Sequence, residues 1–304
     1  MSGLYAGIAC LDTLMPSALV SNPMLRGILL TLVSVACFAS HDAVAKYLAG
    51  LYPILLLTWF RYLSHTLLMG AVLLPKHGLS ILRSQRPWLQ LTRALALLGV
   101  SLLFVTGLRY VPLAEATAVI FLAPLLVTLL SATLLRERIN LAQWLAVVLG
   151  FIGVLVIVRP AGAMFTPAIL WPLGAALCFA LYQILTRISA AHDSAATSNF
   201  LAGAINCLIV SLLIPFFWQT PQWQHLLGLL SLGVIGMCGH QLLILAFRQA
   251  SPAILAPFSY GQLLFAGLFG WLVFDQVPDA RALLGMALIM LAGLGIAYTQ
   301  GRGR

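Results

Sequence analysis

The sequence predicts an all-α integral membrane protein in which ten transmembrane helices form two five-helix inverted repeats around a central cavity. Three observations lead to this fold class: 62% of the 304 residues are hydrophobic, only 8% are charged, and Pro, Gly and charged residues divide the chain into ten apolar stretches. Soluble proteins carry about 25% charged residues. A helix needs about 20 apolar residues to cross a bilayer, so this length allows roughly ten crossings.

The ten predicted spans fall into two sets of five. The first set is expected at 26–48, 53–74, 89–109, 113–135 and 141–158, and the second at 168–188, 198–218, 226–247, 252–274 and 281–299. These sets give one repeat at 24–160 and another at 168–299. Residues 1–23 are interpreted as an N-terminal tail and not a signal peptide, because they lack a basic start and carry Asp12. Residues 300–304 form a basic C-terminal end.

The distribution of Lys and Arg predicts the orientation in the membrane. With the N-terminus inside the cell, eleven of the 16 Lys and Arg residues fall at cytoplasmic positions, four at the outer ends of spans, and Arg61 inside a span. Cytoplasmic loops of membrane proteins are enriched in Lys and Arg, so we expect both termini in the cytoplasm. The net charge of +9 then reflects topology. No basic run alternates with exposed aromatic residues, and no nucleic-acid partner is expected.

Landmarks in the two halves recur in register. Cys37-Phe-Ala matches Cys178-Phe-Ala at a shift of 141, and this shift places His41 and Asp42 opposite Tyr182 and Gln183. In the later spans, residues 121–126 match 259–264 at a shift of 138. Because each half has an odd number of spans, the second half must run with inverted topology. Transporters with such repeats bind their substrate near the bilayer midplane, between the halves. Pro124 and Pro257 are expected to kink or open spans four and nine.

Asp42 and Arg61 are the leading site candidates because both lie deep inside predicted spans. Asp42 stands eight residues before Gly50, and Arg61 stands eight residues after Pro53, so each lies about 12 Å from the turn between the first two spans. A charge at the bilayer centre costs roughly 2.5–3.5 kcal/mol on insertion scales, so such residues are paired or hydrated. Two interpretations stay open: a gate or coupling pair for substrate or a proton, or a static ion pair.

Histidines within apolar spans form a second group of candidates. His41 and His65 accompany the two charges, with His65 one turn beyond Arg61 on the same face. Imidazole titrates near physiological pH, so either a proton-linked role or a hydrogen-bonded packing role fits both residues. His240 and Gln241 add a polar pair, because two such side chains in succession cannot both face lipid without cost.

Further polar residues could line or gate a cavity. Glu115 stands three residues into the fourth span, where the helix dipole favours a carboxylate and where an extracellular gate would also lie. Aromatic and amide side chains suit a planar or amphipathic metabolite, although hydrogen bonds between helices explain them equally well. The residues of this kind expected in the second half of the cavity are Tyr182, Gln183, Asn206, Tyr260 and Gln262.

The absence of several motifs narrows the function. The sequence holds no Walker loop, nucleophile elbow, HExxH motif or metal-ligand cluster, so neither ATP hydrolysis nor a cofactor is expected. We predict a secondary transporter of a small organic metabolite, with a small-molecule substrate, the lipid bilayer and either a proton or an exchanged solute as its partners. Two alternatives stay open: a membrane-embedded enzyme, and a passive channel or partner subunit. The oligomeric state is not predicted.

Short motifs in order along the chain resemble those of the drug/metabolite transporter superfamily, in its ten-span branch built from two EamA domains. The motifs are Asp42-Ala-Val-Ala-Lys46-Tyr, Phe60-Arg61, Ala114-Glu-Ala-Thr-Ala118 with Pro124, Gly150-Phe-Ile-Gly153-Val and Phe274-Asp-Gln-Val-Pro-Asp279. Within the superfamily, the sequence is similar to bacterial riboflavin and S-adenosylmethionine uptake carriers. The resemblance implies a cavity lined mainly by the first, third and fourth helices of each half, and a location in the bacterial inner membrane.

Overall fold

The structure is a computed structural model that describes residues 23–134, 140–158, 167–250 and 252–302. The residues in these ranges form helices and turns, and no strand occurs among them. Nearly all of the predicted N-terminal tail, and the last two residues of the basic end, lie outside them.

Within the described residues, the first half of the chain forms six α-helices and the second half another six. The first six are α3 (Pro23–Ala49), α4 (Ile54–His77), α5 (Pro87–Tyr110), α6 (Leu113–Ile120), α7 (Ala123–Leu134) and α8 (Leu141–Val158). The second six are α9 (Leu170–Ser189), α10 (Ala195–Leu213), α11 (Trp223–Gln249), α12 (Pro252–Ser259), α13 (Gly261–Phe274) and α14 (Ala280–Arg302). Three short 3-10 helices, η1 (Gly78–Leu82), η2 (Pro167–Ile169) and η3 (Ile214–Phe216), adjoin them.

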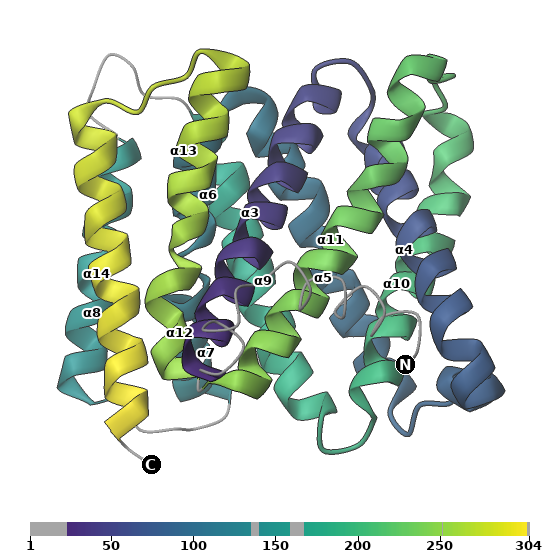
Figure 1. Cartoon of the computed structure of the whole chain (residues 1–304), viewed down its shortest axis with the longest axis horizontal. Coiled ribbons are helices and arrows are strands. Elements are labelled where there is room, and N and C mark those ends of the chain that lie inside the picture. The colour runs from purple at the N-terminus through teal and green to yellow at the C-terminus, as the bar shows by residue number, and fades with distance from the viewer. Residues whose placement is uncertain (1–22, 135–139, 159–166, 251, 303–304) are drawn as a thin grey trace.

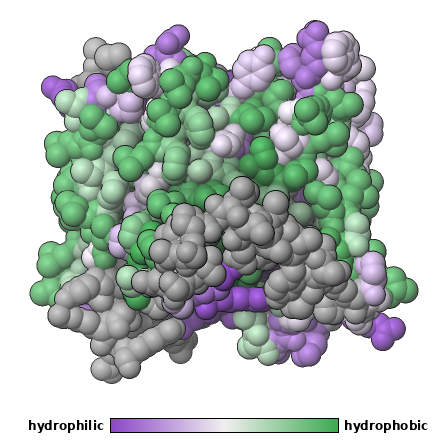
Figure 2. Space-filling view, in the orientation of Figure 1, coloured by the Kyte–Doolittle hydropathy of each residue, from purple (hydrophilic) through white to green (hydrophobic). Residues whose placement is uncertain are grey.

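The outer surface of the bundle is that of a membrane protein. In the part of the chain that the structure describes, seven helical stretches are long and apolar enough to cross a bilayer, and shorter apolar helices lie at Leu141–Ile157 and Ala280–Gly295. Figure 2 shows hydrophobic residues over the middle of the visible face and hydrophilic residues gathered at its upper and lower edges. Exposed tryptophans lie near helix ends, as in the aromatic belts at membrane interfaces. They are Trp88, Trp144, Trp171, Trp218, Trp223 and Trp271.

Two of the predicted spans are interrupted. The helix breaks between Ile120 and Ala123, where α6 passes into α7, and between Ser259 and Gly261, where α12 passes into α13. The two breaks are 138 residues apart, which is the shift found between the later spans of the two halves. Pro124 and Pro257 lie within four residues of them, and each lacks the backbone N–H that a continuous helix requires. The interruptions predicted at these prolines are therefore present.

The main helix contacts cross from one half of the chain to the other. The first helix of the first half, α3, packs against α11 and α13, whereas the first helix of the second half, α9, packs against α5 and α7. Helix α4 packs against α10, and α8 packs against α14. Figure 1 shows the last two pairs at opposite sides of the bundle.

Helix α11 lies between α3 and α4, and glycines permit its close approach to both. A Cβ atom added at Gly233 would collide with Ser64 and would lie 2.5 Å from the Arg61 carbonyl oxygen, both on α4. One at Gly239 would lie 2.7 Å from the Phe38 ring on α3. Small residues at three-residue spacing thus allow tight packing, as the sequence predicted.

Candidate functional site

A buried carboxylate joins helices from the two halves of the chain. Asp42, on α3, is 8% exposed. Its Oδ1 lies 3.0 Å from Nδ1 of His41, and its Oδ2 accepts a hydrogen bond of 3.1 Å from Nε2 of Gln262, on α13. Gln262 follows the break between α12 and α13 by two residues, so the interrupted helix places an amide donor against the charge on α3.

The predicted contact between Asp42 and Arg61 is absent from the described structure. Arg61 Nη1 instead donates a hydrogen bond of 3.3 Å to Ser101 Oγ on α5. Asp42 and Arg61 belong to consecutive helices, but α11 packs against both of those helices and keeps α3 and α4 largely apart. Equal depth therefore did not bring the two charges together. The structure groups Asp42 with His41 and Gln262, three residues that the sequence analysis had treated separately.

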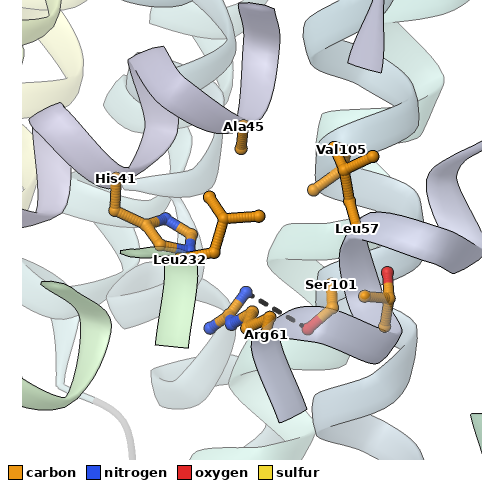
Figure 3. A pocket seen from close by; sticks show the side chains of 8 residues that line it. His41, Ala45, Leu57, Arg61, Ser101, Val105 and Leu232 are labelled. Carbon is orange, nitrogen blue, oxygen red and sulfur yellow. Dashed lines mark hydrogen bonds between the residues drawn. The ribbon is translucent and has the colours of Figure 1, made fainter. Parts of the chain in front are cut away.

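A small cavity lies beside these groups (Figure 3). In the close-up, the Arg61 guanidinium and the His41 ring extend toward the same space from different helices. Its volume is about 10 Å³, near the lower limit for one water molecule. The lining residues are His41, Ala45, Leu57, Thr58, Arg61, Ser101, Val105 and Leu232. A metabolite can enter this space only if the surrounding helices separate.

The other histidines lie around the same region in different settings. Arg61 is within electrostatic range of both His65 and His240. His65 packs against α10, where a Cβ atom at Gly203 would lie 2.7 Å from its Nδ1. The His240 ring meets the edge of Phe38, with centroids 4.9 Å apart. Gln241 is half-buried on α11. These residues surround the Arg61 region, but none of the three side chains lines the cavity.

Lys46 and Arg109 reciprocally cap two helices and do not belong to the charge site. Lys46 Nζ, in the last turn of α3, donates to the carbonyls of Leu108 (2.6 Å) and Val111 (2.7 Å) at the end of α5. Arg109, in the last turn of α5, donates to the Ala49 carbonyl (2.6 Å) at the end of α3. Cations at helix C-termini satisfy carbonyls that lack intrahelical partners. Lys46 is therefore not a second partner of Asp42.

Arg93, on α5, belongs to a buried polar network that was not predicted from the sequence. Its side chain is fully buried. Its Nε donates to Thr186 Oγ1 (2.7 Å), Nη2 to Tyr182 Oη (2.8 Å), and Nη1 to the Ser198 carbonyl (2.6 Å). Two longer bonds, of 3.3 and 3.4 Å, go to Asn199 and Gln90. All five guanidinium hydrogens are thus used, and they join α5 to α9 and α10.

Spacing along two helices could have revealed this network. Gln90 and Arg93 are three residues apart on one face of α5, and Tyr182, Thr186 and Ser189 follow one face of α9 at intervals of four and three. Polar residues in such rows on apolar helices indicate a buried contact. The assignment of Tyr182 to the cavity is corrected accordingly, because its hydroxyl and ring contact Arg93.

The network continues to the end of the bundle where α3 begins, which is the lower end in Figure 1. Gln90 Nε2 donates to Asp193 Oδ2 (2.8 Å) in the turn between α9 and α10, and Ser84 Oγ donates to the same oxygen (2.5 Å). Partial burial opposes ionisation of Asp193, but hydrogen bonds from Ser84, Gln90 and the Gln85 amide outweigh it and hold the pKa of this carboxylate below its usual value.

Polar contacts also join the halves at the opposite, upper end. Tyr52, in the turn between α3 and α4, shares a hydrogen bond of 2.9 Å with His225 Nδ1 on α11. The Leu113 amide donates to Gln276 Oε1 (3.3 Å), beyond the end of α13. Glu115 lies in the first turn of α6, within electrostatic range of Lys46.

Two other predicted cavity residues occupy different surroundings. Tyr260, at the break between α12 and α13, is 5% exposed, and its ring lies 5.0 Å from that of Phe121. A Cβ atom at Gly293 would collide with its hydroxyl, so Tyr260 packs toward α14 and away from Asp42. Gln183 is half-buried on α9. Of the residues assigned to the second half of the cavity, Gln262 is the one that reaches the Asp42 site.

Comparison with known proteins identifies the family. Two segments that cover most of the chain, residues 25–159 and 166–298, match the EamA-like transporter family. The chain belongs to the EamA-like transporter family. The predicted resemblance to the EamA branch of the drug/metabolite transporter superfamily is therefore confirmed.

Relatives of this EamA-like protein are transporters of different compounds. It is 29% identical to an S-adenosylmethionine uptake transporter of Rickettsia felis, over 91% of this chain and 94% of that protein. It is 32% identical to a riboflavin transporter of Vibrio cholerae (90% and 93%), and 27% identical to a pseudopaline exporter of Pseudomonas aeruginosa (93% and 99%). The protein is accordingly a multi-span membrane transporter and not an enzyme.

A solved structure shows the same fold. A chain described as "Crystal structure of protein" superposes with a TM-score of 0.62 and covers 91% of this chain and 98% of its own length. The two sequences are 22% identical, so this likeness concerns the fold alone.

Proposed function

We propose that this EamA-like protein is a secondary transporter that moves a small organic metabolite by alternating access between two five-span inverted repeats. The observation that carries the proposal is the buried Asp42–His41–Gln262 site, which joins the two halves beside a closed cavity within the bundle. An intramembrane carboxylate with titratable neighbours is a functional site by default. The relatives' substrates, S-adenosylmethionine and riboflavin, are the first compounds to assay.

The exchange pattern of helix contacts supports the inverted repeats. If each helix of the first half is replaced by its counterpart in the second, the packing of α3 on α11 becomes that of α9 on α5, and the pairs α4–α10 and α8–α14 are unchanged. The equivalent breaks in the two interrupted spans follow the same relation. A pseudo-twofold axis in the membrane plane produces this arrangement, and with it ten crossings.

Polar contacts between the halves at both ends support alternating access. At the lower end, Arg93 and Gln90 close the bundle against α9 and α10. At the upper end, Tyr52 binds His225. A carrier must open these ends in turn, and hydrogen bonds can break and re-form without large changes inside either half. The excess of Lys and Arg at the lower end supports placing that end, with both termini, in the cytoplasm of a bacterial cell.

A proton is a suitable coupling ion because the site pairs an imidazole with a carboxylate. His41 Nδ1 faces Asp42, while His41 Nε2 has no hydrogen-bond partner in the described structure. The ring can therefore gain or lose a proton at Nε2 while its bond to Asp42 persists. A pH gradient is expected to drive accumulation of the substrate.

Counterflow in proteoliposomes tests the proposal. Vesicles loaded with unlabelled S-adenosylmethionine or riboflavin should take up the labelled compound with saturable kinetics, which a passive channel does not show. The Asp42→Asn variant should lose at least ~10-fold of this activity, since an amide carries no charge to couple. Asp275→Asn is the matched control, because Asp275 is exposed in a left-handed turn that Asn adopts readily. Full activity of the Asp42→Asn variant would contradict the assignment of the site.

A further inference from the structure

The cations on the helices of this protein differ in burial and in how completely their hydrogen bonds are satisfied: Lys46 and Arg93 are buried, Arg61 is partly buried and Arg109 is exposed. Lys46, Arg93 and Arg109 each donate to at least one main-chain carbonyl at 2.7 Å or less. Arg61, within the described residues, donates a single bond of 3.3 Å to a hydroxyl, Ser101 Oγ. A guanidinium has five N–H donors, so four of those of Arg61 have no acceptor among the residues that the structure describes.

The nearby carboxylate does not compensate Arg61. Asp42 accepts its hydrogen bonds from other residues, Oδ1 from His41 and Oδ2 from Gln262, and no bond joins it to Arg61 within the described residues. The remaining described contact of the Arg61 guanidinium is with the ring of Tyr62, whose centroid is 5.8 Å away. A charge inside a membrane is costly when few acceptors compensate it, so the Arg61 guanidinium favours the binding of an anion.

The surroundings of Arg61 define the kind of anion. Ser101 and Thr58 line the cavity beside it together with Leu57, Val105 and Leu232, and the surface that these side chains present to the cavity is apolar. A guanidinium binds the two oxygens of a carboxylate in a planar, bidentate arrangement. The apolar wall is suited to the carbon skeleton attached to that carboxylate.

We infer that the substrate of this transporter carries a carboxylate, and that Arg61 binds it in the cavity between α3, α4 and α5. This inference rests on the proposed transport function and names the chemical class that the site selects. The bound carboxylate replaces the acceptors that the protein itself does not provide. Arg61 is thus a substrate-binding residue and not half of a structural ion pair.

His41 couples this binding to one proton. Because Asp42 accepts a bond at His41 Nδ1, the neutral ring presents the lone pair of Nε2, and Nε2 belongs to a residue that lines the cavity. A carboxylate there is repelled by a lone pair and attracted by an N–H. The anion therefore enters together with a proton that binds Nε2 on one side of the membrane and leaves with the anion on the other.

The groups that face His41 from its neighbouring helices are compatible with this step. These groups are the carboxyl of Asp42 on α3, the guanidinium of Arg61 on α4 and the imidazole of His240 on α11. Gln262 on α13 and Ser101 on α5 do not titrate. A carboxylate bound at Arg61 offsets the positive charge of the guanidinium, which otherwise repels a second positive charge on the His41 ring. Binding of the anion therefore favours uptake of a proton by His41.

Thermal-shift measurements on purified protein, with matched pairs of compounds, test the inference. The probes are S-adenosylmethionine, aromatic and aliphatic amino acids and simple organic acids, each beside its methyl ester, with riboflavin as a ligand that has no carboxylate. At least one acid should raise Tm while its ester does not, and binding should strengthen as pH is lowered toward 6. Arg61→Gln should weaken that binding by ~100-fold, and Arg61→Lys should weaken it less.

A ligand-free comparison tests the same point independently. Without added ligand, Arg61→Gln should leave Tm unchanged or raise it, because the Arg61 side chain makes one hydrogen bond within the described residues. Arg93→Gln should lower Tm, because the Arg93 side chain makes five. Equal losses in the two variants would overturn the inference, as would stabilisation by an ester equal to that by its acid, or no shift with any acid. Saturable riboflavin counterflow that persists in Arg61→Gln would overturn the inference while leaving the proposed transport function intact.

Discussion

Replacement of Arg93 with methionine should destabilise the protein by about 2–4 kcal/mol. Three hydrogen bonds shorter than 3.0 Å, to Thr186, Tyr182 and Ser198, would be lost, at about 0.5–1.5 kcal/mol each. Loss of a buried charge removes a desolvation cost, but the Ser198 carbonyl and the Tyr182 hydroxyl are left without that donor. Removing one partner from a satisfied buried network is therefore net destabilising.

Equilibrium unfolding of the purified protein in mixed micelles, followed by circular dichroism, measures this change. Arg83→Met is the matched control, because Arg83 is exposed at the same end of the bundle. It should lie within about 0.5 kcal/mol of the unmodified protein. If the unfolding free energy of Arg93→Met were as close to the parent value as that of Arg83→Met, the network would not join α5 to α9 and α10 as inferred.

Three further predictions use the same measurement. Gly233→Ala should destabilise by about 1–3 kcal/mol, because its Cβ would collide with Ser64, whereas Gly236→Ala, whose Cβ would lie 3.8 Å from the His41 ring, should not. Lys46→Met should cost about 1–2 kcal/mol by leaving the end of α5 uncapped; a neutral effect would contradict the capping role. Because the folded pKa of Asp193 is lowered, its stabilising contribution is present above the unfolded value near 3.9 and is lost as pH falls through the folded value, and Asp193→Asn should remove this acid dependence.

Hydropathy and the positions of Pro, Gly and charged residues were sufficient to predict the helical stretches and their interruptions. Span boundaries follow from the long apolar runs, and the breaks follow from Pro124 and Pro257. The glycine series on α11 predicted close packing, because only a missing side chain permits such an approach. These features depend on a few residues that are near one another in sequence, and the sequence therefore reveals them.

The partners of the charges were not predictable in this way. Depth along consecutive helices suggested that Asp42 meets Arg61, but the contact depends on which helix lies between them, and α11 comes from the other half of the chain. Arg93 was missed because its acceptors on α9 and α10 are about 90–105 residues away. Hydropathy identifies a helix face that is polar, but it does not identify the helix that the face meets.

The register shared by the two halves of the sequence does not extend to the partners of equivalent residues. The repeat places Tyr182 opposite His41, and the structure shows that these equivalent positions have different partners. Tyr182 meets Arg93 on α5, which fills its space with a guanidinium whose five donors are used. His41 meets α11 at Gly236, where an added Cβ atom would lie 3.8 Å from the His41 ring. The two equivalent positions therefore pack against different residues of the opposite half of the chain.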